Sequence, residues 1–299
     1  MITVASLRKN FQTVSVKESA RNIYNKAAES AGQLRSVKFS MPDMIEGLNR
    51  AKGDVSKLWV GAVIVVATVL PQLALLLNPI LGSYVTALAL VGVLSVALAN
   101  NKVRKLAISA AILPLATMVS LSISATSSML TRISVEYAVI LVLSVTYRYL
   151  FKIKPVKKQR VGLKKYPQVL PLMIIIGEVL GAAAFGMLRH QYIFKGSSLP
   201  LVAVAVITFA ATEELFFRGL IQYFATKLMR PAYAAVLTAI VYTGTAIGLG
   251  SVLPVGFMLI AAAAISAIYF YKQNLVLTTF ANVAMKLTYL GLIVTFILK

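Results

Sequence analysis

The segment TEELFFRGL, residues Thr212 to Leu220, gathers the side chains of this sequence that are best suited to chemistry. Glu213 and Glu214 are adjacent carboxylates, and Arg218 follows Glu214 by four residues. In a helix this spacing puts Glu214 and Arg218 on one face, where they can form an ion pair. Glu213 is rotated by about 100° and points to a different neighbour. On physical grounds alone, a buried structural ion-pair network accounts for this pattern as well as a functional site does.

The surroundings of these carboxylates are strongly apolar. The chain has 299 residues, of which 59% are hydrophobic and 13% are charged, whereas a soluble domain has about 45–50% apolar and about 25% charged residues. We therefore expect an all-α, polytopic transmembrane helical bundle. The net charge of +21 comes from 30 Lys and Arg against 9 Asp and Glu. Most cations lie between apolar runs. They therefore indicate how the chain is oriented in a membrane and that it contacts anionic lipid, rather than that it binds nucleic acid.

The apolar runs predict eight or nine membrane-spanning helices. A helix needs about 20 apolar residues to cross the hydrocarbon core. Pro71 and Gln72 interrupt the first run, so this helix is the least secure as a full crossing. The predicted spans are 58–77, 80–99, 106–125, 133–151, 168–188, 199–227, 233–249, 253–271 and 276–298.

The loops between these spans predict an orientation. With nine spans, the basic N-terminal region, the Asn101–Lys105 turn and the basic loop around Lys152–Lys165 alternate onto one side. The positive-inside rule then puts the N-terminus in the cytoplasm and Lys299 outside. We divide the chain into a basic polar region (1–57), N-terminal transmembrane helices (58–151), a basic cytoplasmic loop (152–167) and a C-terminal transmembrane core (168–299).

Residues 1–57 hold ten Lys and Arg against five acids, with apolar positions interleaved. They include SVKESARNIYNKAAESAGQL, which is typical of an amphipathic helix. We expect this region to contact anionic lipid at the membrane surface or an acidic cytosolic partner, and a solvated tail or surface helix is the alternative. The start of the sequence lacks an apolar run, so no cleavable signal peptide is expected.

The remaining four acids all lie inside predicted spans, where an unpaired charge costs about 2.5–3.5 kcal/mol on insertion scales. Glu136 follows Arg132 by four residues, and a local ion pair explains it. Glu178 is either a neutral acid or the partner of a charge on another helix. Glu213 and Glu214 lie roughly 20 Å into their helix, counted from Leu199.

The string EELFFRG resembles the first motif, EExxxR, of the CAAX prenyl protease and bacteriocin-processing family of intramembrane endopeptidases. The resemblance covers roughly residues 168–298. It implies a glutamate-dependent peptide hydrolase in which Glu213 is the general base and Glu214 and Arg218 support it. In this family a second motif, FxxxH, supplies a histidine that helps to activate water. A third motif, HxxxN or HxxxD, stabilises the oxyanion.

The later motifs of the family are incomplete in this chain. The FxxxH position is occupied by Tyr242 to Ala246, so alanine replaces the histidine. Asn282 and Lys286 stand where HxxxN belongs. The chain has one histidine, His190, which falls in a predicted outer loop far from Glu213. It has no cysteine, so it has no disulfide and no thiolate nucleophile, and we expect neither a metal site nor a cofactor.

The missing groups weaken the expected chemistry. General acid–base help contributes roughly 10²–10⁴-fold and an oxyanion donor about 10²–10³-fold in rate. A lysine beside Glu213 would hold the carboxylate ionised and make it a poorer base. We therefore expect Glu213, Glu214, Arg218 and Lys286 to form a neutral paired core, with Asn282 adding hydrogen bonds.

These residues are compatible with three functions. The first is a pseudoprotease that binds a membrane peptide or protein partner. The second is a diverged active endopeptidase that uses Glu213 with Asn282 and Lys286 as electrophilic donors. The third is a transporter or channel-like protein that uses the buried charges.

Overall fold

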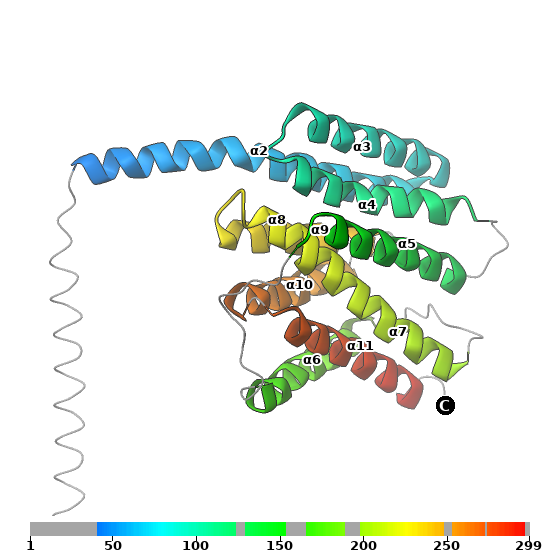
Figure 1. Cartoon of the computed structure of the whole chain (residues 1–299). Coiled ribbons are helices and arrows are strands. Elements are labelled where there is room, and N and C mark those ends of the chain that lie inside the picture. Colours follow the sequence, from blue (N-terminus) through cyan, green and yellow to red (C-terminus); the bar gives the residue numbers. More distant parts are fainter. Residues whose placement is uncertain are drawn as a thin grey trace, which may run out of the picture. The chain divides into compact units, whose positions relative to one another are not determined.

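Every regular element in the described part of the chain is a helix (Figure 1). The computed structural model describes residues 41–123, 129–153, 166–188, 198–247, 253–272 and 274–296, the first 18 and a few helix-end residues by their backbone alone. The elements are α2 (Met41–Leu77), α3 (Pro79–Ala99), α4 (Arg104–Leu121), α5 (Met129–Leu150), α6 (Tyr166–Leu188), α7 (Leu199–Glu213), the π-helix η3 (Glu214–Gln222), α8 (Tyr223–Ala225), α9 (Pro231–Ile247), α10 (Leu253–Lys272) and α11 (Leu275–Phe296).

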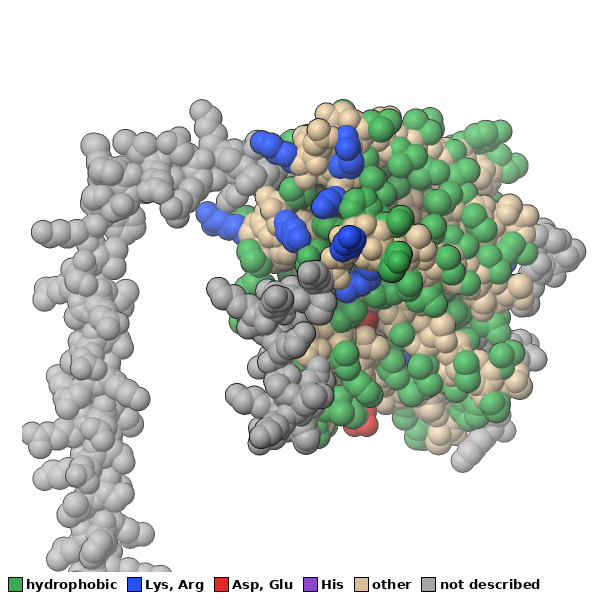
Figure 2. Space-filling view, in the orientation of Figure 1, with side chains coloured by type: hydrophobic (Ala, Val, Ile, Leu, Met, Phe, Trp, Pro, Cys, Tyr) green, Lys and Arg blue, Asp and Glu red, His purple; other side chains and the backbone are tan. Residues whose placement is uncertain are grey.

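The expected multi-pass helical bundle is confirmed. Because α7, η3 and α8 follow one another without a break, the described residues contain nine helices. Seven of them include a segment long and apolar enough to cross a membrane. The other two are shorter as apolar helices: Val255–Tyr271 within α10, and α9 with 17 residues. Hydrophobic side chains cover most of the visible face of the bundle, and Lys and Arg gather toward one end of it (Figure 2).

The first predicted span differs from expectation. Helix α2 is continuous through Pro71, and Trp59–Leu77 qualifies as a full span. Proline removes one backbone donor, but transmembrane helices tolerate this when neighbouring groups satisfy the freed carbonyl. Gln72 is buried, and its Nε2 lies 3.5 Å from Oγ1 of Thr117 on α4. The expectation that Pro71 and Gln72 interrupt the span is therefore wrong, because tertiary packing accommodates both residues.

Helices α6 and α11 pack closely and run in the same direction. Gly177 lies against Ala281, and Gly181, four residues further along α6, lies against Met285, four residues further along α11. A β-carbon at either glycine would collide with the carbonyl oxygen of the α11 residue it faces. Glycine is thus required at both positions for the two backbones to approach this closely.

Helices η3 and α10 also run in the same direction. Arg218 Nη2 donates to the Ala262 carbonyl at 3.2 Å, and Gln222 Nε2 donates to the Ser266 carbonyl at 3.1 Å. Both contacts advance by four residues on each helix, so η3 and α10 are parallel. The chain must therefore cross back through α9 before α10 can begin. The short α9 therefore traverses the bundle.

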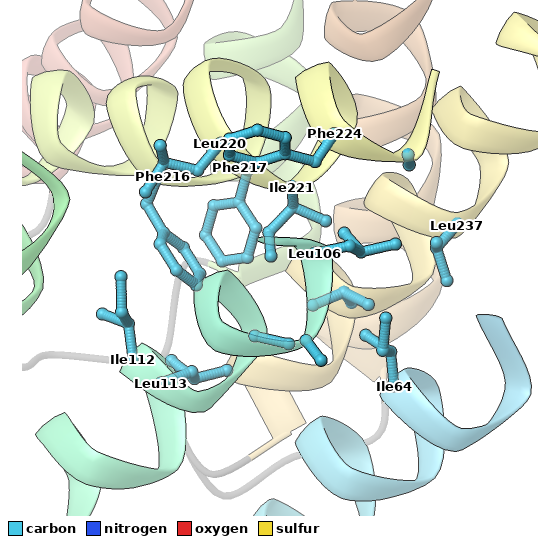
Figure 3. Close-up of a cluster of buried hydrophobic side chains, with 14 of the residues drawn as sticks. Ile64, Leu106, Ile112, Leu113, Phe216, Phe217, Leu220, Ile221, Phe224 and Leu237 are labelled. Atoms are coloured by element: carbon cyan, nitrogen blue, oxygen red, sulfur yellow. The ribbon is translucent and has the colours of Figure 1, made fainter. Parts of the chain in front are cut away.

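The largest hydrophobic core is centred on η3. Phe216, Phe217, Leu220 and Ile221 are buried and belong to one cluster with residues of α2, α4 and α9. Figure 3 shows the side chains of Phe216, Phe217 and Ile221 directed from η3 toward the helix that carries Leu106. Burying a large apolar side chain contributes about 1.5–3 kcal/mol. Packing in this core therefore fixes the position of η3, which carries most of the polar motif.

Several predictions concern residues outside the described ones. The chain divides between Gly53 and Asp54, and the bundle belongs to the unit that begins at Asp54. The lipid contact of residues 1–57, most of the basic loop 152–167 and the surface position of His190 fall wholly or largely outside the described residues. These expectations, like the division of the chain into four regions, stay predictions.

Candidate functional site

The two carboxylates lie where the helix changes its winding. Glu213 is the last residue of α7, and the π-helix η3 begins at Glu214. Such π-helical turns are rare and occur frequently at functional sites. Within this π-helix the Gly219 carbonyl accepts a hydrogen bond from Arg148 Nη1 of α5 at 2.9 Å. A β-carbon at Gly219 would lie 3.0 Å from that nitrogen, so the glycine after Arg218 makes room for Arg148.

Glu214 is neutralised locally, as its spacing from Arg218 predicted. Arg218 Nη1 lies 3.1 Å from Glu214 Oε1, and both side chains are fully buried. The guanidinium also lies 4.9 Å from the centre of the Tyr242 ring, in a cation–π contact. Asn282 Nδ2 donates to the same Glu214 oxygen at 3.0 Å. The predicted ion pair of Glu214 with Arg218 is confirmed.

Glu213 accepts hydrogen bonds from four side chains on three other helices. At Oε1, Lys286 Nζ lies at 2.6 Å and the Tyr137 hydroxyl at 2.5 Å. At Oε2, the Tyr242 hydroxyl lies at 2.9 Å and Asn282 Nδ2 at 3.0 Å. A carboxylate offers about four lone-pair sites. The donors from α5, α9 and α11 therefore use the whole accepting capacity of Glu213.

All five predicted site residues converge on one buried cluster. The predicted pairing of Lys286 with Glu213 is confirmed by their contact, and Asn282 bridges the two glutamates. The cluster holds two carboxylates and two cations, so its formal charge is zero. Lys286 is its most open charged member, with 22% of its side chain exposed. The catalytic or structural role of these residues stays a prediction.

Two residues of the site were not predicted from the sequence. Tyr242 was noted as the aromatic residue of the second motif, but its hydroxyl was given no role. Tyr137 lies 76 residues before Glu213 and belongs to no motif. It also stacks on Phe209 of α7, with ring centres 4.4 Å apart. The only sequence signal for Tyr137 is a polar group inside an apolar span.

The other two acids of the spans lie apart from this cluster. Glu136 accepts a hydrogen bond from Thr117 at 2.7 Å, and its ion pair with Arg132 stays a prediction. Glu178 is exposed on α6. Within the described part of the chain, no cluster of three or more His, Asp and Glu side chains could hold a metal ion.

The fold and the site together define a polytopic helical membrane protein with a buried, glutamate-centred polar cluster. Residues 195–288 match the family model of type II CAAX prenyl endopeptidases, described as Rce1-like. This match confirms the resemblance of the EELFFRG string and its surroundings to the CAAX prenyl protease and bacteriocin-processing family. The matched segment contains all five predicted site residues, and helices α2 to α6 precede it. Comparisons with curated proteins and with solved structures found no match.

Proposed function

We propose that this CAAX-protease-like membrane protein is a pseudoprotease, in which the former catalytic cluster is a structural core of a membrane-embedded binding module. Its partner is a membrane peptide or protein. The main support for this proposal is that Glu213 has no accepting capacity left. Its two oxygens accept hydrogen bonds from Lys286, Tyr137, Tyr242 and Asn282. A general base must accept a hydrogen bond from the water that it activates. In this cluster a water molecule would first have to displace a protein donor.

The charges of the cluster support the same proposal. A lysine in direct contact with Glu213 stabilises the ionised carboxylate and weakens it as a base. No histidine stands at Ala246 or Asn282, so the groups that assist water activation and oxyanion binding in the resembled family are replaced. Losing both kinds of help removes several kcal/mol of transition-state stabilisation.

A diverged endopeptidase is the second candidate, and the exposure of Lys286 favours it. The Lys286 side chain is 22% exposed, whereas the Glu213 side chain is 5% exposed. A substrate carbonyl arriving at Lys286 could accept a hydrogen bond there and leave one lone pair of Glu213 open to water. This candidate requires the Lys286–Glu213 pair to separate during turnover.

The test measures cleavage and binding on the same preparation. The full chain in lipid nanodiscs is incubated with a panel of fluorogenic prenylated peptides that end in CAAX sequences, beside Glu213→Ala. A pseudoprotease gives the same background rate in both proteins, while a photoreactive version of a bound peptide crosslinks to the chain and is displaced by excess unlabelled peptide. Cleavage that depends on Glu213 would establish the endopeptidase instead.

A further inference from the structure

Helix α6 presents two different faces to its surroundings. Its inner face packs on α11 and α10 through buried positions such as Met173, Gly177 and Gly181. The opposite face consists of exposed residues over the length of the span: Leu172, Ile175, Glu178, Val179, Ala182, Ala183, Gly186 and Met187. We call these eight residues the outer face of α6. In a bilayer this face meets either lipid chains or another transmembrane helix.

Glu178 lies at the centre of the membrane-spanning part of α6. The apolar segment is Val169–Met187, so Glu178 is equally far from both ends, or about 14 Å at the rise of an α-helix. Its neighbours on the face are apolar and exposed, with Ile175 at 53% and Val179 at 64%. A glutamate side chain is too short to reach the polar headgroups from the middle of a core about 30 Å thick.

A charged Glu178 side chain is unfavourable at this position if the outer face of α6 contacts only lipid. A charge at the bilayer centre costs about 2.5–3.5 kcal/mol on insertion scales, and such residues are normally paired or directed into a polar site. Lys286 and Arg218, the cations of the buried cluster, are engaged with Glu213 and Glu214. A cation on a helix of another protein would remove the cost of a charged Glu178.

The next turns of the outer face allow a close approach. Ala182, Ala183 and Gly186 are small and exposed, and a β-carbon built at Gly186 meets no atom within 4 Å. Transmembrane helices associate where small residues let their backbones come together and where polar side chains pair across the contact. The outer face combines both features on one helix.

We propose that the outer face of α6 docks a transmembrane helix of another protein that carries a Lys or Arg at mid-membrane depth. Charge complementarity selects this occupant. A second copy docked by the same face would bring two Glu178 carboxylates together, which is repulsive in a medium of low dielectric constant. The proposal concerns a surface other than the Glu213 cluster, so it holds whether or not that cluster cleaves peptides.

The test titrates a defined helix against the full chain. A fluorescent Leu/Ala peptide of transmembrane length with one central Lys, and its twin with Leu at that position, are added to labelled protein in nanodiscs, and energy transfer is measured. We expect the Lys peptide to associate roughly tenfold more tightly than its twin. Glu178→Gln should abolish that difference.

A matched pair of glycine variants tests the geometry. Gly186→Leu fills the outer face and should weaken binding of the Lys peptide, whereas Gly92→Leu, on α3 and equally open, should leave it unchanged. Equal affinity for the two peptides would overturn the proposal, and so would a preference for Lys that survives Glu178→Gln. Self-association of the chain that is lost in Glu178→Gln would show that a second copy occupies the face, and would also overturn it.

Discussion

At the scale of single residues, Glu213 acts as a junction between helices. Its own helix changes from α to π winding at this residue, and its four hydrogen-bond donors come from α5, α9 and α11. Hydrogen bonds to charged groups contribute about 1.5–3 kcal/mol each. A carboxylate held in this way is well suited to joining helices and poorly suited to exchanging its partners with water.

The ion pair of Lys286 with Glu213 gives a prediction about stability. Lys286→Met leaves the buried carboxylate without its countercharge, so we expect a loss of about 3–5 kcal/mol in the free energy of unfolding. Adding Glu213→Gln removes the stranded charge and should recover much of that loss. Thermal unfolding in detergent, with each single variant and the double variant, measures both effects.

Lys227→Met is the control for this experiment, because Lys227 is exposed and contacts Tyr223 of its own segment. It should change stability little. If Lys286→Met is as stable as the unchanged chain, the paired-core interpretation is wrong. If Lys286→Met abolishes Glu213-dependent peptide cleavage while the fold stays intact, the diverged enzyme is the better account.

At the scale of elements, the close packing of α6 on α11 stabilises the helix that supplies Asn282 and Lys286. Gly177 and Gly181 form a small-residue stripe whose neighbours on α11 are mostly backbone atoms. Backbone cannot move aside as a flexible side chain can, so a larger residue must push the two helices apart. The distance from α11 to Glu213 thus depends on glycines that lie outside the family motif.

A glycine comparison within α6 tests this dependence. We expect Gly181→Leu to lower the free energy of unfolding by about 1–3 kcal/mol or more through overpacking. Gly186→Leu, five residues along the same helix and facing open space, should have little effect. Melting temperatures of the two variants in one detergent give the comparison. Equal melting temperatures would mean that α6 and α11 can separate without loss.

At the scale of the whole molecule, the directions of the helices favour a chain that crosses the membrane repeatedly. The parallel pairs α6 with α11 and η3 with α10 follow from alternating directions of consecutive helices. This alternation puts the Asn100–Arg104 turn, the end of α5 and the turn between α8 and α9 at one end of the bundle. Lys102, Lys152 and Lys227 lie in or beside these turns. Under the positive-inside rule we propose that this end is cytoplasmic.

Cysteine labelling tests the orientation on a clean background, because the chain has no native cysteine. With an impermeant reagent applied to intact cells, Ser197→Cys should be labelled from outside. Gln159→Cys should be labelled only after the membrane is opened. The reverse pattern would overturn the proposed topology, and labelling of both residues from the same side would contradict an odd number of crossings between them.

The sequence by itself determined the class of fold, because a run of about 20 apolar residues has few alternatives to a transmembrane helix. It also determined the Glu214–Arg218 pair, since a spacing of four residues within one helix is a local property. The pairing of Lys286 with Glu213 could be predicted only because the family motif aligned two distant segments.

The tertiary structure decided the rest of the site. Tyr137 and Tyr242 reach Glu213 from helices whose local sequences do not specify that contact. Local sequence sets the faces and lengths of helices, but the relative placement of α5, α9 and α11 comes from packing between residues far apart in the chain. The saturation of Glu213 is such a property, because it exists only when donors from three other helices meet at one carboxylate.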